Sequence, residues 1–283
     1  MPHLSLKRTL AYAALPCLLL SACSTANRDL TRQASVESRK ALGAGDFQKA
    51  LDGFKAASQK NPRSKELTES YARTVEEIKR TADQALRQRD FARAANIYRV
   101  LFNNYAGFGG FAVKLTFNRS SLEISIKNCR VGIIDGPAQE DLKAGNFAKV
   151  LEIYQAALQE FPGDAGLVAS YVRAVQAVKA AGDEALADQD FVRSGKVYAL
   201  LFRNFPSFGG LQPAVALARA DLVGPLGVCR ESLTKMGLAE YRKGNLAKAI
   251  AVWEGLLSFD PDNAEIRKAV NTAKTQLNEI IKK

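Results

Sequence analysis

The chain of 283 residues is 47% hydrophobic and 24% charged, a composition that excludes a disordered protein and is typical of a globular one. Its net charge is +11, and +9 remains when the two cations of the N-terminal leader, Lys7 and Arg8, are set aside. This excess favours anionic partners, but basic and acidic residues are interleaved and no nucleic-acid module is present, so we expect no nucleic acid. The only histidine, His3, lies in the leader. The rest of the chain therefore cannot hold histidine-dependent catalytic or metal sites, and we expect no enzyme activity, metal or cofactor.

Residues 1–22 have the pattern of an export signal. The pair Lys7-Arg8 precedes an apolar stretch from Leu10 to Leu20, which is too short to span a membrane. The stretch ends in Leu20-Ser21-Ala22-Cys23, which resembles the bacterial lipobox; the alternative is an ordinary signal peptide with a chance cysteine. The resemblance implies lipidation of Cys23 and cleavage before it, and Ser24 then implies sorting to the outer membrane. Residues 23–34 are small and polar, which predicts a lipidated N-terminus and tether.

A tandem duplication organises the rest of the chain. Residues 41–133 align with 141–233 at a constant shift of 100, so that Phe108-Gly109-Gly110 matches Phe208-Gly209-Gly210. A truncated third copy follows at a shift of 99. We therefore expect a first copy over 35–133, a second over 134–232 and a terminal hairpin with a capping helix over 233–283.

Each copy contains a shorter helical unit, represented by residues 45–62. Gly45 suits a left-handed helix end, Asp46 suits an N-cap, and the apolar residues that follow lie on one helical face until Pro62 ends the helix. The pattern recurs at 145–162 and 244–261, and in weaker form at 90–105 and 190–206, where Arg89 and Gln189 replace the glycine. This spacing resembles the second helix of a tetratricopeptide repeat (TPR).

The resemblance implies an all-α superhelical solenoid of about five TPR-like hairpins, arranged as a duplication plus a half-copy. The TPR period is 34 residues, and the units of this chain are longer because they contain two extra elements. Residues 64–88 and 164–188 each predict one long amphipathic helix. In the Gly-Gly segments, residues 111–128 alternate apolar and polar as a β-hairpin does, whereas 212–223 have a helical pattern, and the sequence leaves open which the fold keeps.

The resemblance also implies a partner-binding groove. Lys79 and Asp83, with their counterparts Lys179 and Asp183, fall where the first helix of a TPR faces the concave surface and can clamp a peptide carboxylate. Three further cations belong near the same surface: Arg87, Lys143 and Arg242. The alternative is a solvated helix face with lysine–aspartate pairs, in the order that supports a helix less well.

Three other features have both functional and structural interpretations. Cys129 and Cys229 form either a disulfide or two buried thiols; equivalent positions in successive copies are expected to lie too far apart for the bond. The Gly-Gly pairs either contact a ligand or turn the chain. Trp253 replaces Phe54 and Tyr154, which are core positions, so it is expected in the core.

The sequence thus predicts a membrane-anchored TPR lipoprotein of the Gram-negative cell envelope, a non-enzymatic scaffold that binds other envelope proteins in its groove at the periplasmic face of the outer membrane. Expected processes are assembly of an outer-membrane, secretion or cell-wall complex. The alternative is a binding protein for an anionic glycan, lipid or cell-wall polymer, held by the positive charge.

Overall fold

The computed structural model describes the backbone of residues 15–211 and 214–282, and the side chains within these ranges from Arg28 onward. Most of the predicted signal peptide, including His3, lies outside the described residues, as does the side chain of Cys23.

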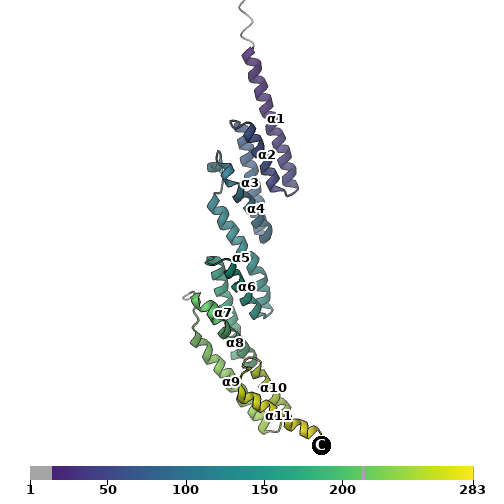
Figure 1. Cartoon of the computed structure of the whole chain (residues 1–283), viewed down its shortest axis with the longest axis vertical. Coiled ribbons are helices and arrows are strands. Elements are labelled where there is room, and N and C mark those ends of the chain that lie inside the picture. The colour runs from purple at the N-terminus through teal and green to yellow at the C-terminus, as the bar shows by residue number, and fades with distance from the viewer. Residues whose placement is uncertain (1–14, 212–213, 283) are drawn as a thin grey trace, which may run out of the picture. The chain divides into compact units, whose positions relative to one another are not determined.

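The described chain is helical throughout (Figure 1). Three short 3-10 helices accompany the α-helices: η1 (Tyr105–Phe108), η2 (Ala112–Lys114) and η3 (Gly209–Leu211). Over the residues that can be described there is no strand, so the predicted all-α helical-repeat fold is confirmed. The α-helices are α1 (Leu15–Gly43), α2 (Phe47–Lys60), α3 (Lys65–Arg87), α4 (Phe91–Asn104), α5 (Arg119–Lys143), α6 (Phe147–Glu160), α7 (Ala165–Ala187), α8 (Phe191–Phe208), α9 (Arg219–Arg242), α10 (Leu246–Leu257) and α11 (Ala264–Ile281).

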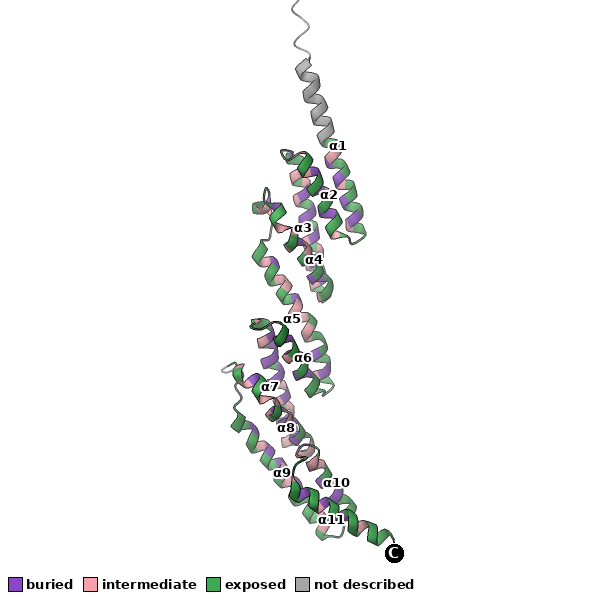
Figure 2. Ribbon diagram, viewed as in Figure 1, coloured by how far each residue is buried: buried purple, intermediate pink, exposed green. Residues whose placement is uncertain are grey.

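The chain divides into two compact units after Ile133, at the junction between the two expected copies. Unit 1 contains the hairpins α1–α2 and α3–α4 and the beginning of α5, from which Leu122 and Cys129 are buried in its core. Unit 2 contains the end of α5 with α6, the hairpins α7–α8 and α9–α10, and the capping helix α11. In each unit the buried residues lie on the helix faces that meet one another (Figure 2).

The turns between paired helices follow from local sequence. Gly45, Gly145 and Gly244 all have positive φ, at 76°, 76° and 80°, as predicted for a left-handed helix end. Arg89 and Gln189 take the same conformation at 62° and 59°, where a side chain is strained.

The residue after each of these turns starts the next helix. The carboxylates of Asp46, Asp90 and Asp190 each accept a hydrogen bond from a backbone N–H three residues later, at 3.0–3.1 Å. Asn146 does not cap its helix in this way and donates instead to Asp141, at 2.9 Å.

The long helices α3 and α7 match their predicted ranges, 64–88 and 164–188, because capping residues bound both. Ser64 and Asp164 accept from the N–H of Leu67 and Leu167 at 3.2 Å. Gln88 and Asp188 end the two helices with backbone N–H groups bonded to the previous turn. The predicted apolar face of α3 is buried from Leu67 to Ala82.

Four local features differ from what the sequence patterns indicated. The tether expected over 23–34 belongs to α1, and Thr31 and Ala34 are buried because their small side chains fit against the neighbouring helices. No β-hairpin forms over 111–128: η2 and the start of α5 occupy it, and its alternation arises from Phe111 and Phe117, which are buried on either side of an exposed Val113. Of the segment 212–223, which has a helical pattern, residues 212–213 lie outside the described residues, 214–218 are not helical and 219–223 form the start of α9. Pro206 does not end α8, which continues for two residues to Phe208.

Candidate functional site

The predicted groove pair of unit 1 connects two helices. The Nζ of Lys79 lies 2.7 Å from Oδ1 of Asp83, one turn along α3. The same carboxylate oxygen accepts a hydrogen bond from the hydroxyl of Tyr98 on α4, at 2.6 Å. Lys79 also lies over two aromatic rings, 5.8 Å from the centroid of Tyr98 and 6.0 Å from that of Phe117. Its charge is therefore largely satisfied within unit 1.

The second copy repeats this arrangement. Lys179 lies 2.7 Å from Asp183, and the hydroxyl of Tyr198 on α8 donates to the same aspartate. This pair is more open, because the side chains of Lys179 and Asp183 are 34% and 49% exposed, against 19% and 31% for Lys79 and Asp83. The remaining exposure leaves Lys179 the more accessible of the two lysines.

The pKa values of Asp83 and Tyr98 follow from these contacts. Burial alone would raise the pKa of Asp83, but hydrogen bonds from Lys79 and Tyr98 outweigh it and hold the pKa below its ordinary value. The pKa of Tyr98 is raised by burial and by its bond to Asp83, so the phenol stays neutral. An ionised aspartate between a lysine and a tyrosine joins the two helices of the hairpin.

Of the other predicted groove cations, Arg87 helps to lower the pKa of Asp83 through its charge, one turn along α3. Arg87, Lys143 and Arg242 are exposed and lie in the last turns of α3, α5 and α9. A cation there complements the partial negative charge of the helix C-terminus. Each is thus placed to stabilise its own helix.

The first Gly-Gly segment returns across α3 of its own unit. Phe108 is fully buried, with its ring 5.9 Å from that of Tyr71 in an edge-on contact. Further along, the backbone N–H of Thr116 donates to Glu76 on α3 at 2.6 Å, and its hydroxyl donates to the other carboxylate oxygen at 2.7 Å. Gly109 and Gly110 are exposed. The segment therefore covers part of the α3 face on which a groove was expected.

Cys129 and Cys229 are free thiols, each fully buried in a different unit. Burial raises the pKa of both, which lowers the fraction of reactive thiolate. Of the two interpretations, this structure has the buried thiols.

Trp253 lies in the core, as expected. It is 4% exposed, and its ring centroid is 5.8 Å from that of Tyr241. Across the helix pair it faces Gly237 of α9.

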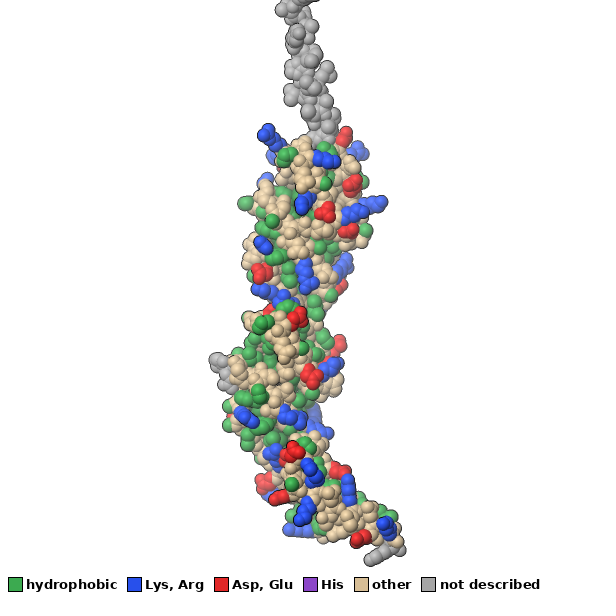
Figure 3. Space-filling model, in the orientation of Figure 1, with side chains coloured by type: hydrophobic (Ala, Val, Ile, Leu, Met, Phe, Trp, Pro, Cys, Tyr) green, Lys and Arg blue, Asp and Glu red, His purple; other side chains and the backbone are tan. Residues whose placement is uncertain are grey.

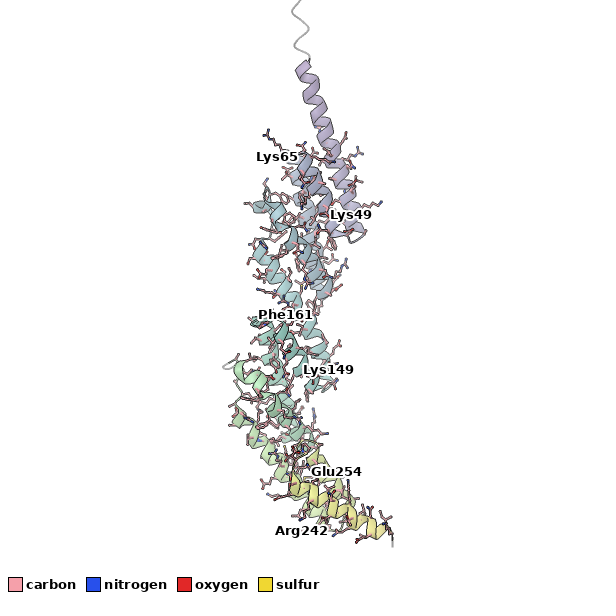
Figure 4. All side chains as sticks on the ribbon, viewed as in Figure 1. Lys49, Lys65, Lys149, Phe161, Arg242 and Glu254 are labelled. Atoms are coloured by element: carbon pink, nitrogen blue, oxygen red, sulfur yellow. The ribbon has the colours of Figure 1, made fainter. Side chains whose placement is uncertain are left out.

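Sequence analysis missed a cleft on unit 2. About 450 Å³ in volume, it lies between the start of α6 and the middle of α8. Phe147, Val197 and Leu200 are its apolar residues, and Lys149 and Lys196 stand at its edge; Figure 4 labels Lys149. Both lysine side chains are exposed, and Lys149 pairs with Asp141 at 2.8 Å.

The two copies differ in the hydrogen bonds made beside this cleft. In unit 1 the residue equivalent to Ala148 is Gln48, whose side-chain amide exchanges hydrogen bonds with that of Asn104 on α4. Alanine at position 148 cannot make this bridge, and Asn204 bonds to Gln155 instead, at 3.1 Å. The copies also differ at other lining positions, among them those where Lys196 replaces Asn96 and Val197 replaces Ile97.

Charge also separates the units. Residues 28–133 contain 20 lysines and arginines against 11 aspartates and glutamates, whereas residues 134–283 contain 18 of each. The +9 of the chain beyond the leader therefore belongs entirely to unit 1. Unit 1 therefore attracts an anionic partner more strongly than unit 2 does.

Two properties of the described residues bear on membranes and metals. None of the helices described is long and apolar enough to cross a membrane. Nor do these residues include a group of three or more histidine, cysteine, aspartate or glutamate side chains that could hold a metal ion.

Comparison with known proteins gives little. No family model matches the chain, and no curated protein matches it. One solved structure, described as a "Circular tandem repeat protein with novel repeat topology and enhanced subunit contact surfaces", is 14% identical to it, with a TM-score of 0.21. That match covers 92% of this chain and 64% of the other, so this chain corresponds to less than two thirds of the other's length. A similarity of this size carries no inference about function.

Proposed function

We propose that this chain is a TPR lipoprotein, anchored through lipid on Cys23, that acts as a non-enzymatic scaffold for other envelope proteins at the periplasmic face of the outer membrane. Serial hairpins support the proposal, since repeat proteins offer extended surfaces for partners. The lipobox-like Leu20–Cys23 supports the anchor, since two or three acyl chains hold a protein stably at a membrane.

The cleft between α6 and α8 is the observation that carries the scaffold proposal. Its apolar residues can bury part of a partner's side chain, and Lys196 can pair with a neighbouring carboxylate. We assign it to a protein segment that presents an apolar residue next to an acidic one. The paired Lys79 and Asp83 of unit 1 are a weaker choice, because their charges already satisfy one another.

The two copies supply a test. A photo-crosslinking residue replaces the exposed Lys149, at the edge of the cleft, and in a second strain replaces the exposed Lys248 on α10. In intact cells we expect a discrete crosslinked protein from position 149 and none from 248. Adding Ala148→Gln, which restores the side chain of the first copy, should reduce the crosslink at least about tenfold while thermal unfolding is unchanged. An unaffected crosslink would place partner binding outside the cleft.

The anchor has a separate test. Cys23→Ala should abolish palmitate labelling and release the protein from membranes that have been washed with salt, with unchanged circular dichroism. Palmitate labelling of the Cys23→Ala protein would show that another residue carries the lipid.

The concentration of charge in unit 1 favours a second candidate, a binding protein for an anionic glycan, lipid or cell-wall polymer. Such binding weakens steeply with salt, because exposed charges are screened over about 8 Å at physiological ionic strength. Binding of a partner protein through the apolar cleft depends less on the salt concentration. Titration at several salt concentrations therefore discriminates between the two.

A further inference from the structure

The positive charge of unit 1 gathers at one end of its hairpins. Helix α2 ends at Lys60, Arg63 lies in the connecting loop, and α3 begins at Lys65. All three side chains are exposed, and that of Lys65 is 86% exposed. Lys65 makes one ion pair, a long contact of 4.0 Å with Glu69, which contributes little to stability at such an exposed site.

The equivalent loops of the later copies reverse the charge. Residues 60–66 contain three cations and one carboxylate, whereas residues 160–166 contain Glu160 and Asp164 and no cation. At a shift of 99, residues 259–265 contain three carboxylates and no cation. The loop can fold with either a positive or a negative charge, because all three copies keep the proline and the helix-capping residue. These are Pro62 and Ser64, Pro162 and Asp164, and Pro261 and Asn263.

Helix α1 adds charge to the same end. Helix α2 runs antiparallel to α1, so the part of α1 that holds the exposed Arg28 and Arg32 lies beside the end of α2 and the start of α3, while α1 itself extends back to Leu15. Three carboxylates share this end, those of Asp29, Glu66 and Glu69, so five cations leave a net positive charge. Lysine and arginine side chains stand out there in Figure 3, and Lys65 projects from it in Figure 4.

We propose that this end of unit 1, formed by Arg28, Arg32, Lys60, Arg63 and Lys65, docks on a bilayer surface rich in anionic phospholipid. Arg28 follows Cys23 by five residues, about 8 Å along a helix and one Debye length at physiological salt. A lipid on Cys23 would thus bring these cations to the headgroups. This placement rests on the proposed anchor, whereas the lipid preference can be measured without it.

The test uses full-length Cys23→Ser protein, which cannot be lipidated at that position, and sedimentation with vesicles. One set of vesicles contains phosphatidylcholine with 30% phosphatidylglycerol, and the other phosphatidylcholine alone. The apolar leader is common to all variants, so differences between them report on the basic end. We compare Lys60→Gln/Arg63→Gln/Lys65→Gln with a triple of equal charge change at the other end of the hairpins, Lys40→Gln/Lys49→Gln/Arg93→Gln.

Each basic residue near an anionic surface contributes about fivefold to binding, so the loop triple should lower partition onto anionic vesicles by about 100-fold. The control triple should lower it less than about fivefold, and neither should change binding to neutral vesicles. If the two triple variants lose vesicle binding equally, the protein is attracted by its net charge and has no docking end. If the loop triple loses no binding, the loop does not contact the bilayer. Either result overturns the proposal. Failure of Cys23 lipidation in cells would instead refute the anchor and leave this result standing.

Discussion

Gly237 is predicted to be a position where alanine destabilises a helix. A Cβ added at Gly237 on α9 would lie 2.2 Å from Nε1 and 2.5 Å from Cδ1 of Trp253 on α10. The indole has little freedom to move, because it is 4% exposed and contacts Tyr241. Overpacking a core costs about 1–3 kcal/mol, and this contact with a rigid ring belongs at the upper end. Replacing glycine by alanine inside a helix also stabilises that helix by about 1 kcal/mol, which offsets part of this cost. We therefore expect Gly237→Ala to destabilise unit 2 by about 2 kcal/mol.

The matched control lies on the same helix. Gly227 is exposed, and a Cβ added there meets nothing within 4 Å. Gly227→Ala should therefore keep the propensity gain and stabilise unit 2 by up to about 1 kcal/mol. The two identical substitutions on α9 are expected to have opposite signs.

Trp253 makes the measurement specific to unit 2, since it is the only tryptophan of the chain. Urea unfolding followed by its fluorescence should give a lower midpoint for Gly237→Ala and a higher one for Gly227→Ala. A midpoint raised equally by both substitutions would refute the packing argument and show that α9 and α10 adjust to admit a methyl group.

The remaining predictions concern unit 1. Gly45→Val should destabilise it by about 1 kcal/mol or more, because a β-branched residue is strained at φ 76°. Conversely, Arg89→Gly should stabilise unit 1 by up to about 1 kcal/mol, because glycine adopts φ 62° without the strain of a side chain. Thermal unfolding followed by circular dichroism measures both effects. A lower melting temperature for Arg89→Gly would contradict the argument. The folded-state pKa of Asp83 lies below its ordinary value of 3.8, so its stabilising contribution is present above that pH and is lost as the pH falls through the lowered value. Asp83→Asn should reduce the loss of melting temperature between pH 5 and pH 2, and an identical pH profile would exclude Asp83 as a contributor.

Local signals made much of the fold predictable. Gly45 and Asp46 specify a left-handed helix end and an N-cap through their own backbone and side chain, without help from the rest of the chain. The ranges of α3 and α7 were predictable for the same reason, since Ser64 and Asp164 cap their own helices.

Features that depend on tertiary packing were not predictable in this way. Helix α1 resembles a linker in sequence because its inner face carries small residues, Thr31, Ala34, Ser38 and Ala41, whose burial depends on contact with other helices. The lysine–aspartate pairs matched a groove motif, but whether Asp83 is free depends on a tyrosine 15 residues further along. The cleft of unit 2 was not predictable from the sequence, because it depends on how α6 and α8 lie beside each other.

The two buried thiols make the stability of each unit separately measurable. Cys129 and Cys229 occupy equivalent positions, one in each unit, and an alkylating reagent can reach them only when the surrounding helices open. Where reclosing is faster than alkylation, the labelling rate of each cysteine reports the free energy of opening around it. Mass spectrometry of the two labelled peptides from one sample would therefore compare the opening free energy of the basic unit with that of the neutral unit.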